Sequence, residues 1–434
     1  MTDLHLRTRS DEREPRSPLL LDWFGRGVAS TISGSLTDLT RGLGAPDRAA
    51  VDLLHLAVAV YAADKVVPRE TQPDLWTREL RVHVPVSDRR LFHAATPAFT
   101  DALTFLTNDA WELRFRSDVG SRADEQAVQP FGVDAVSLFS GGLDSLAGAI
   151  DLLERGRSVM LVGHYDSNLL RPRQERLAER LRAEFGEDRV FYRPFYLRPA
   201  TASPHQARPL PSPREPTTRS RSFLFVAAAG VVASTLDRRG IQMPENGYIS
   251  LNVPLEASRL GACSTRTTHP HFLRLLREAL TQAEVGPEID NPYELKTKGE
   301  VIEHCRDRDL LLQLAPHSIS CAHPEVGRWM GEAYGNCGYC FPCLMRRAAL
   351  HQLGADDPRH YRVDVGDQAF LASGGTRTRH LRALIDSIRR PSRPRDILRS
   401  GPIPRGRVRE FSEVYERGRA EIRAWLRAAV PASR

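Results

Sequence analysis

Apolar and polar positions divide the chain into two parts with different patterns. Residues 1–18 are charged and proline-containing, and this composition predicts a disordered tail. Residues 19–130 mix helix-like and strand-like periods and predict an extra N-terminal α+β region. Its expected elements are a largely buried helix, an alternating strand, a second helical run and another strand at residues 51–67, 80–86, 89–106 and 111–115. Because this region carries no chemical motif, we expect it to have a structural or partner-docking role.

Beyond Asp134 the pattern changes to an alternation of apolar strands with helices. The predicted strands lie at residues 136–139, 158–163, 189–197 and 249–253. The predicted helices lie at residues 146–153, 174–185, 223–236 and 270–282. This alternation predicts an α/β fold with a doubly wound parallel sheet over residues 131–320. In such sheets ligands bind at the carboxyl ends of the strands, where the strand order reverses.

The first of these strands ends in the turn Ser140-Gly-Gly-Leu-Asp-Ser145, which leads directly into a helix. The two glycines permit backbone angles that a Cβ atom forbids, and Asp144 or Ser145 can cap the helix. Free N–H groups and the helix dipole make a helix start a binding place for phosphate. The turn is not a Walker A loop, because no Gly-Lys-Ser/Thr follows the glycines. We expect phosphate contacts at Ser140, Gly141, Gly142, Leu143, Asp144 and Ser145.

Four of the six cysteines are spaced as metal ligands. They are Cys321 and, after fifteen intervening residues, a run with a thiol at every third position, Cys337, Cys340 and Cys343. Four thiolates can surround one tetrahedral ion and leave no open position, so the spacing predicts a structural Zn²⁺ site in a segment of residues 321–350. An iron–sulfur cluster uses the same ligands and stays open as an alternative. We interpret Cys263 and Cys305 as ordinary buried thiols.

Length and composition favour a soluble cytoplasmic protein without a membrane segment. The 434 residues allow two or three domains, and no run of about 18 apolar residues or signal-peptide core occurs. The net charge of +7 leaves nucleic acid open as a partner, but only three basic residues are Lys, which is typical of coding bias towards Arg. Two of these lysines, Lys296 and Lys298, therefore stand out as candidate site residues. Residues 351–434 are predicted to form an Arg-rich helical extension.

The turn at residues 140–145 matches the SGGxDS pyrophosphate loop of the N-type ATP pyrophosphatases, also called PP-loop enzymes. Together with the cysteine spacing and the segment Asn291-Pro292 to Lys296-Thr297-Lys298-Gly299-Glu300, residues 130–350 resemble the 7-cyano-7-deazaguanine synthases (QueC family). The resemblance implies an enzyme that uses ATP and Mg²⁺ to adenylate the carboxylate of a 7-deazaguanine, lets ammonia form an amide, and dehydrates the amide to a nitrile. It also implies catalytic roles for Asp144, Lys296 and Lys298, and a phosphate or carboxylate contact for Arg221.

Three added segments depart from the biosynthetic pattern: the N-terminal region, a Pro-rich insertion at residues 198–221 and the Arg-rich extension. This layout resembles the QueC-like proteins of bacterial Qat anti-phage systems. The resemblance implies a protein partner from the same defence system and an amine acceptor that is either ammonia or a protein amine. The Pro-rich insertion is interpreted either as a flexible lid over the nucleotide or as a plain surface insertion. Thr267 and His269 are candidates for the second substrate pocket.

Two other functions share some of these features. An RNA-thiolating enzyme has the same loop, but it requires a catalytic cysteine, for which Cys263 is the candidate, and an RNA-binding element. The Arg-rich extension has Trp425 as its sole Trp and lacks an aromatic ladder for stacking bases, so nucleic acid is not favoured as a partner. A non-catalytic nucleotide-sensing scaffold is the second alternative, and the intact turn disfavours it.

Overall fold

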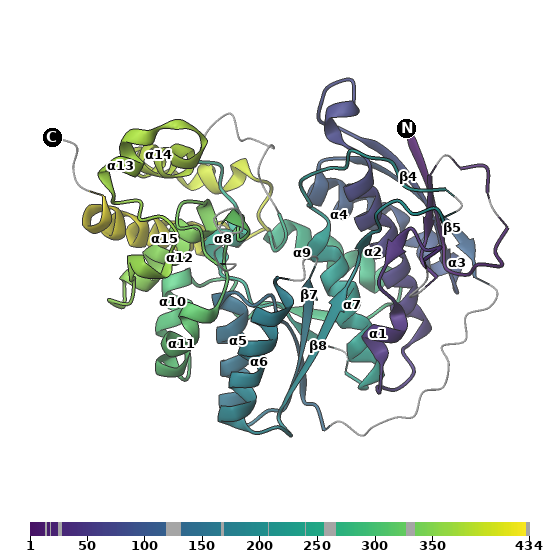
Figure 1. The fold of residues 1–434 in the computed structure, drawn as a ribbon, viewed down its shortest axis with the longest axis horizontal. Coiled ribbons are helices and arrows are strands. Elements are labelled where there is room, and N and C mark those ends of the chain that lie inside the picture. Colours follow the sequence, from purple (N-terminus) through teal and green to yellow (C-terminus); the bar gives the residue numbers. More distant parts are fainter. Residues whose placement is uncertain are drawn as a thin grey trace.

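The computed structural model describes residues 1–13, 15–17, 19–24, 28–118, 132–165, 169–206, 208–238, 240–255, 266–326 and 335–430. Figure 1 shows the N-terminal region and the C-terminal helices on opposite sides of the chain's central part. The predicted boundary between residues 130 and 131, like Cys263, lies outside the described residues. No helix in the described part of the chain is long and apolar enough to cross a membrane.

The central part is a five-stranded sheet in which every strand pair is parallel, with the order β11-β10-β6-β7-β8. Its strands are β6 (Ala135–Leu138), β7 (Val159–Tyr165), β8 (Val190–Tyr196), β10 (Gly240–Gln242) and β11 (Glu288–Asp290). Chain order runs outward from β6 through β7 to β8, and then returns to the other side of β6 for β10 and β11. The strand order therefore reverses between β6 and β10, and the predicted doubly wound parallel sheet is confirmed.

The fourth predicted strand, at residues 249–253, is wrong. Residues Gly247–Leu251 form the short helix α8, because the Asn246 side chain accepts a hydrogen bond from the N–H of Ile249 at 3.0 Å and caps the helix start. Asn252 ends the helix in the left-handed conformation. The strand that takes this place in the sheet is β10, which has only three residues.

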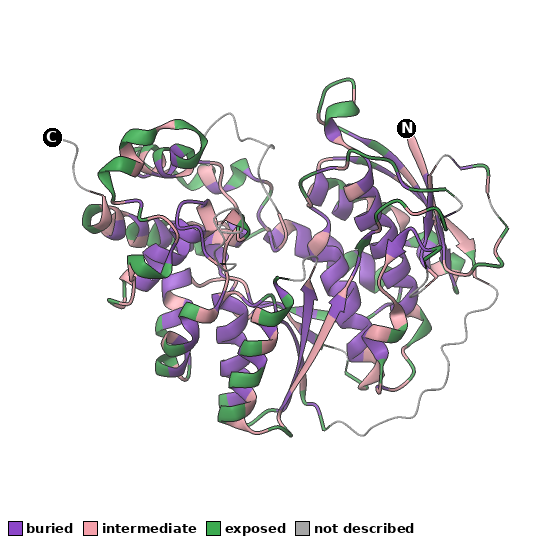
Figure 2. Ribbon diagram, in the orientation of Figure 1, coloured by how far each residue is buried: buried purple, intermediate pink, exposed green. Residues whose placement is uncertain are grey.

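Both faces of the sheet are buried. On one face pack α7 (Arg221–Thr235) and α9 (Pro270–Gln282), and on the other pack α5 (Leu143–Glu154) and α6 (Arg171–Phe185). Within β7, Met160 and Val162 join the first core, whereas Val159 and Leu161 join the second. A run of consecutive apolar residues is what a strand covered on both faces requires. Figure 2 shows buried residues throughout α7, while exposed residues lie along α6.

The N-terminal region is built on a second parallel sheet with the order β2-β1-β4-β5. Its strands are β1 (Thr2–Arg7), β2 (Leu19–Asp22), β4 (Glu79–Val86) and β5 (Ala110–Ser117), and its main helices are α2 (Arg48–Val66), α3 (Arg89–Ala94) and α4 (Thr96–Thr107). The predicted disorder of residues 1–18 is wrong for β1, because Leu4 and Leu6 are fully buried between two partner strands. The parallel pairing makes the region α/β in type, where the sequence predicted α+β.

This region is not a separate domain. Helix α2 packs against α7 and helix α4 against α9, so the apolar residues of both sheets form one continuous core. A buried ion cluster adds to the junction: Arg78, which is 0% exposed, donates to Asp64 at 2.7 Å and to Asp109 at 2.6 Å. Asp64 also accepts from the N–H of Ser220, the N-cap residue of α7, at 2.9 Å and so joins the cluster to the start of that helix.

The Pro-rich insertion lies on the N-terminal region. Its strand β9 (Arg198–Pro199) pairs with β3 (Ile32–Ser33) of that region, which is followed by α1 (Leu36–Thr40). Gln206 donates to the carbonyl of Ser30 at 2.9 Å, and the N–H of Glu215 donates to the carbonyl of Lys65 at 3.0 Å. The interpretation as a flexible lid is therefore wrong, and the insertion ties the two sheets together.

The C-terminal residues build a third core against the cysteine segment. Helices α12 (Phe341–His351), α14 (Gly375–Arg389) and α15 (Val408–Ala429) pack around Leu344, Leu384 and Trp425. The short α13 (Gln368–Ser373) precedes α14, while α10 (Lys298–Glu303) and α11 (Arg308–Leu314) pack on α5. The predicted helical extension is confirmed, and it is packed onto α8 and α10 rather than projecting from the body.

Candidate functional site

The turn at residues 140–145 lies at the carboxyl end of β6, next to the point where the strand order reverses. Gly141 has a φ of +83°, a conformation that L side chains rarely adopt. The Ser140 hydroxyl lies 3.1 Å from the Ser145 hydroxyl. The N–H of Gly142 donates to the Ser140 hydroxyl at 3.3 Å. The turn therefore has the tight strand-to-helix shape that the sequence predicted.

Helix α5 begins at Leu143, and Gly142 is its N-cap. The prediction that Asp144 or Ser145 caps this helix is wrong, because no side chain bonds its first turn from the N-cap position. Among the described residues, the N–H groups of Asp144 and Ser145 have no hydrogen-bond partner, and that of Leu143 has only a long bond of 3.4 Å to the Ser320 hydroxyl. Orphan amides of this kind, together with the helix dipole, favour an anion.

The carboxylate of Asp144 faces two other elements instead. Lys298, the first residue of α10, donates its ammonium to Oδ1, and the side chain of Asn246 donates to Oδ2 at 2.7 Å. Both charged side chains are nearly buried, at 7% exposed for Lys298 and 5% for Asp144. Burial acts to raise the pKa of Asp144, but the Lys298 charge and the hydrogen bonds hold it below its usual value.

Glu245 is a further acid at this place, which the sequence reasoning missed. It follows β10, and the side-chain amide of Asn246 donates to it at 3.2 Å as well as to Asp144. Burial, together with the charge of Asp144, raises the pKa of Glu245 well above its usual value. Two carboxyl groups whose pKa values are shifted in opposite directions therefore lie beside the open helix start. In the sequence, only the short strand before Glu245 could have pointed to this residue. No local sequence pattern predicts that β10 lies beside β6 in the sheet.

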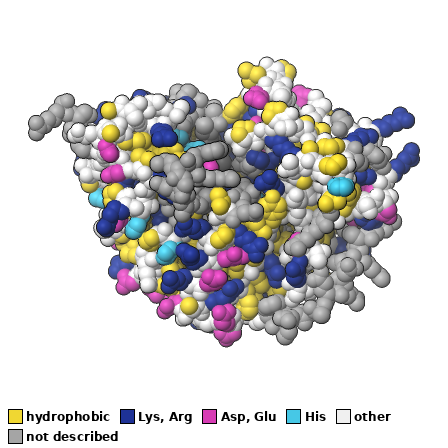
Figure 3. Space-filling model, viewed as in Figure 1, with side chains coloured by type: hydrophobic (Ala, Val, Ile, Leu, Met, Phe, Trp, Pro, Cys, Tyr) yellow, Lys and Arg dark blue, Asp and Glu magenta, His cyan; other side chains and the backbone are white. Residues whose placement is uncertain are grey.

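A cavity of about 920 Å³ opens over the turn. Its wall includes Ser140, Gly142, Leu143, Asp144, Ser145, Glu245 and Lys298. Further along the wall lie apolar and neutral side chains, among them Phe225, Met243, Val253, Thr267 and Phe341. In Figure 3 the molecular surface is hollowed between the two sides of the protein. Ligand pockets span about 300–1,000 Å³, so the cavity has room for a nucleotide and a second small molecule.

The other predicted site residues fall into two groups. Arg221, the first residue of α7, lines the cavity, and its guanidinium donates to the ring and the carbonyl of His164 at 3.0 and 3.1 Å. Thr267 also lines the cavity. Lys296 is not among the residues that line the described wall, and its ammonium lies 5.4 Å from the centre of the Tyr293 ring. His269 is fully buried, caps α9 and packs on Phe105.

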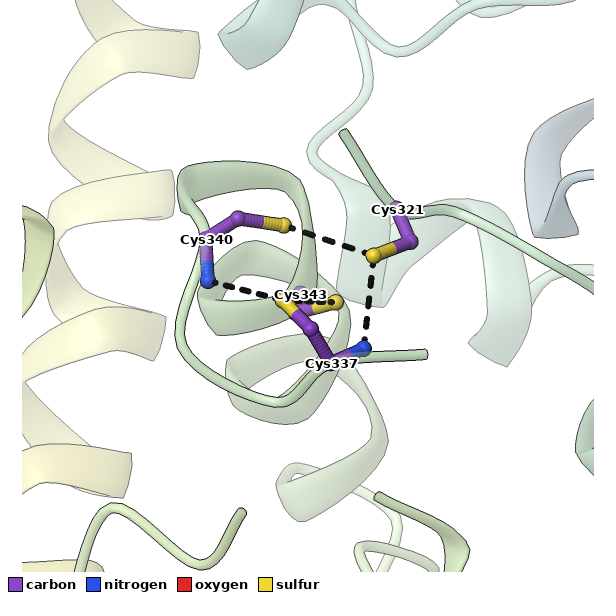
Figure 4. Close-up of side chains that lie close together, drawn as sticks. All are labelled: Cys321, Cys337, Cys340 and Cys343. Atoms are coloured by element: carbon purple, nitrogen blue, oxygen red, sulfur yellow. Dashed lines mark hydrogen bonds between the residues drawn. The ribbon is translucent and has the colours of Figure 1, made fainter. Parts of the chain in front are cut away.

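Four sulfur atoms converge beside this cavity (Figure 4). The Sγ atoms of Cys321, Cys337, Cys340 and Cys343 all lie within 4.8 Å of one another, with separations of 3.8 Å for Cys321 and Cys340 and 3.9 Å for Cys337 and Cys343. A tetrahedral ion with Zn–S bonds of about 2.3 Å places its ligands about 3.8 Å apart. The group could therefore hold a metal ion, as the spacing predicted. Cys305 is buried elsewhere, as expected.

The cysteine group and the turn are joined by the segment that precedes Cys321. The N–H of Ile319 donates to the carbonyl of Gly141 at 2.9 Å, and the Ser320 hydroxyl accepts from the turn as described above. Asn336, the neighbour of Cys337, accepts from the N–H of Ser320 at 3.0 Å. Cys321 itself is half-buried and lines the cavity. The position of the turn therefore depends on the segment that the cysteines hold.

No protein-family model matches the chain, and no curated protein matches it.

Proposed function

We propose that the chain is an AMP-forming PP-loop enzyme that uses ATP to adenylate a deazaguanine-type carboxylate and then transfers the acyl group to an amine, as part of bacterial anti-phage defence. The observation that carries the proposal is the start of α5, where the amides of Asp144 and Ser145 have no partner among the described residues and which opens to a cavity at the reversal point of a parallel sheet. A triphosphate is the kind of ligand that such a place favours.

The proposed reaction has two steps. A carboxylate oxygen of the substrate attacks the α-phosphorus of ATP, and pyrophosphate leaves. The nitrogen of an amine then attacks the carbonyl carbon, AMP leaves, and the amine gives up a proton. The amides of Asp144 and Ser145, with the ammonium of Lys298, would stabilise the charge that develops on the phosphate. Arg221 would hold a phosphate or the substrate carboxylate.

Asp144 and Glu245 would hold the Mg²⁺ that accompanies ATP. Both side chains line the cavity wall, and carboxylate oxygens are the ligands that a hard divalent cation prefers. The ion would neutralise phosphate charge. The second metal of the proposal is a structural Zn²⁺ in the cysteine group, where four thiolates would leave no position for substrate. We assign no role to Lys296, since it stands away from the cavity.

The size of the cavity supports a second substrate beside ATP, and its apolar wall around Phe225 and Phe341 suits a flat aromatic ring. The acceptor amine is either ammonia or an amine of a partner protein from the same defence system. The alternative of RNA thiolation requires a reactive thiol. Among the described residues, the cavity wall carries Cys321, which is already a member of the sulfur group.

Incubation of the protein with ATP, Mg²⁺, 7-carboxy-7-deazaguanine and ammonium tests the proposal. We expect AMP and pyrophosphate in equal amounts, and a product whose mass fits the amide or nitrile. Lys298→Met should lower the rate of AMP formation about 10²–10³-fold, as loss of one preorganised charge does, whereas Lys296→Met should leave it unchanged. Release of ADP instead of AMP, or no turnover with any carboxylate and amine, would reject the proposal.

A further inference from the structure

The two partners of the Asp144 carboxylate come from two short helices, α8 and α10, and both helices rest on α15. Asn246 is the N-cap of α8, and Lys298 is the first residue of α10. Neither helix exceeds six residues, so neither is stable by itself. Their positions must be fixed by what packs behind them, and α15 is in contact with both.

The contact with α10 surrounds Lys298. Glu421 of α15 accepts a hydrogen bond from the Thr297 hydroxyl, one residue before Lys298. Its second carboxylate oxygen accepts from the N–H of Gly299, one residue after Lys298, at 3.2 Å. Arg417, one helical turn earlier on α15, donates to the carbonyl of Leu295 at 2.9 Å and to Glu300 at 2.5 Å. The backbone of Lys298 is therefore held on both sides by one side chain of α15.

The contact with α8 is made by close ring packing. Tyr415 of α15 stacks on Tyr248 of α8, with ring centres 5.6 Å apart and an interplanar angle of 10°. One turn along, Gly418 lets the helices approach so closely that an added Cβ atom would lie 2.2 Å from the Tyr248 ring. The N–H of Gly247, the first residue of α8, also donates to the carbonyl of Lys296 at 2.8 Å. This bond joins the start of α8 directly to the segment before α10.

From these contacts we infer that α15 is a positioning element of the site, and that Glu421 is the residue through which it sets the place of the Lys298 ammonium on the cavity wall. The inference rests on the proposed function for its catalytic meaning, whereas its structural part, the clamp on residues 297–299, stands on the contacts alone. Helix α15 lies outside residues 130–350, the part of the chain that carries the family resemblance, so this role is a property of the added C-terminal segment.

The Lys298 ammonium can stabilise charge on a phosphate only if it is held at the right distance and direction from it. Misplacement of a catalytic group by about 1 Å can lower the rate about 10²-fold. Loss of the Glu421 carboxylate removes one hydrogen bond from each side of Lys298, at the Thr297 hydroxyl and the Gly299 amide, and leaves the segment to the capping box of Thr297 and Glu300. The backbone at Lys298 would then move more, and the Lys298 ammonium would be held less well at the position where it contacts the phosphate.

The test compares three variants of the full chain by two measurements. Glu421→Ala removes the clamp, Glu421→Gln keeps oxygen and amide atoms that can bond Thr297 and Gly299, and Glu413→Ala is the matched control on the outer side of α15, where Glu413 pairs with Arg409 at 2.9 Å. The first measurement is amide hydrogen exchange of residues 297–303. The second is the kcat and KM of AMP formation from ATP.

We expect Glu421→Ala to speed exchange at Gly299 and through α10 at least 10-fold and to lower kcat about 10²-fold with a smaller change in KM. Glu421→Gln should restore most of both values, and Glu413→Ala should match the wild type. Equal exchange in Glu421→Ala and Glu413→Ala would overturn the inference. If the wild type forms no AMP, the proposed function fails, and the exchange data still decide whether Glu421 clamps α10.

Discussion

The buried pair of Lys298 and Asp144 gives the sharpest prediction, because its two charges are almost out of contact with water. We consider Lys298→Met, which keeps the length and apolar stem of the side chain and removes the ammonium. Asp144 would then be a buried carboxylate that keeps the hydrogen bonds from Asn246 and has no cation beside it among the described contacts. Removal of one partner from such a pair destabilises proteins by about 3–5 kcal/mol.

Two further variants separate the charge effect from simple packing. In Asp144→Asn/Lys298→Met both charges are gone, and the side-chain amide of residue 144 can still pair with Asn246. We expect this double variant to lie within about 1–2 kcal/mol of the wild type, since replacing a whole buried pair is often neutral. Lys296→Met removes an ammonium that lies over the Tyr293 ring, which is worth about 0.5–1 kcal/mol.

The assay is urea unfolding followed by far-UV circular dichroism, with the midpoint compared between variants at one pH. The expected order of stability is wild type, then Lys296→Met and the double variant close together, and Lys298→Met clearly lowest. The double variant should be more stable than Lys298→Met by about 2 kcal/mol. If Lys298→Met unfolds at the same urea concentration as Lys296→Met, Lys298 and Asp144 do not form a buried ion pair, and the prediction is wrong.

Three other predictions follow from the structure. Purified protein should contain close to one zinc per chain, and Cys340→Ser should lose the metal and lower the melting temperature; iron in place of zinc, or a stable metal-free Cys340→Ser protein, would contradict the assignment. Arg78→Met should cost about 3–5 kcal/mol, because it leaves Asp64 and Asp109 without their shared partner, and an unchanged melting temperature would contradict the buried ion cluster. Burial raises the pKa of Glu421 from 4.5 to about 7. The hydrogen bonds from Thr297 and Gly299 act in the opposite direction, and the charges of Glu300 and Arg417 have smaller effects. The folded protein therefore binds this proton more tightly than the unfolded chain does. Wild-type stability should therefore fall between pH 5 and pH 8, by on the order of 3 kcal/mol at most, and Glu421→Gln should gain on the wild type over that range; a difference in melting temperature that is constant with pH would refute this.

Local chemistry explains which parts of the fold and site were predictable. The turn at residues 140–145 and the cysteine spacing are local patterns, and both reappear in three dimensions as the sequence indicated. Helix α9 was predicted with its observed bounds, because an amphipathic period and a proline at its start specify it. These features need no knowledge of which strands become neighbours.

The failures involve contacts between distant segments. Strand β1 reads as a charged tail, and it becomes a strand only because residues 19–22 and 80–83 pair with it. The apolar alternation at residues 249–253 imitates a strand, but Asn246 caps a five-residue helix there. Glu245 reaches Asp144 only through the sheet order, so its part in the site could not be read from its own neighbourhood.

The continuous core beneath the main sheet limits which fragments of this protein can fold by themselves. Helix α7 is apolar on every side, with Phe223, Leu224 and Val226 completely enclosed between the sheet and α2. A fragment that starts near residue 131 would expose that surface to water and aggregate, even though it keeps every residue of the family resemblance. The N-terminal part is thus needed to cover the apolar surface of α7, and any partner that it recruits must bind to its outer side.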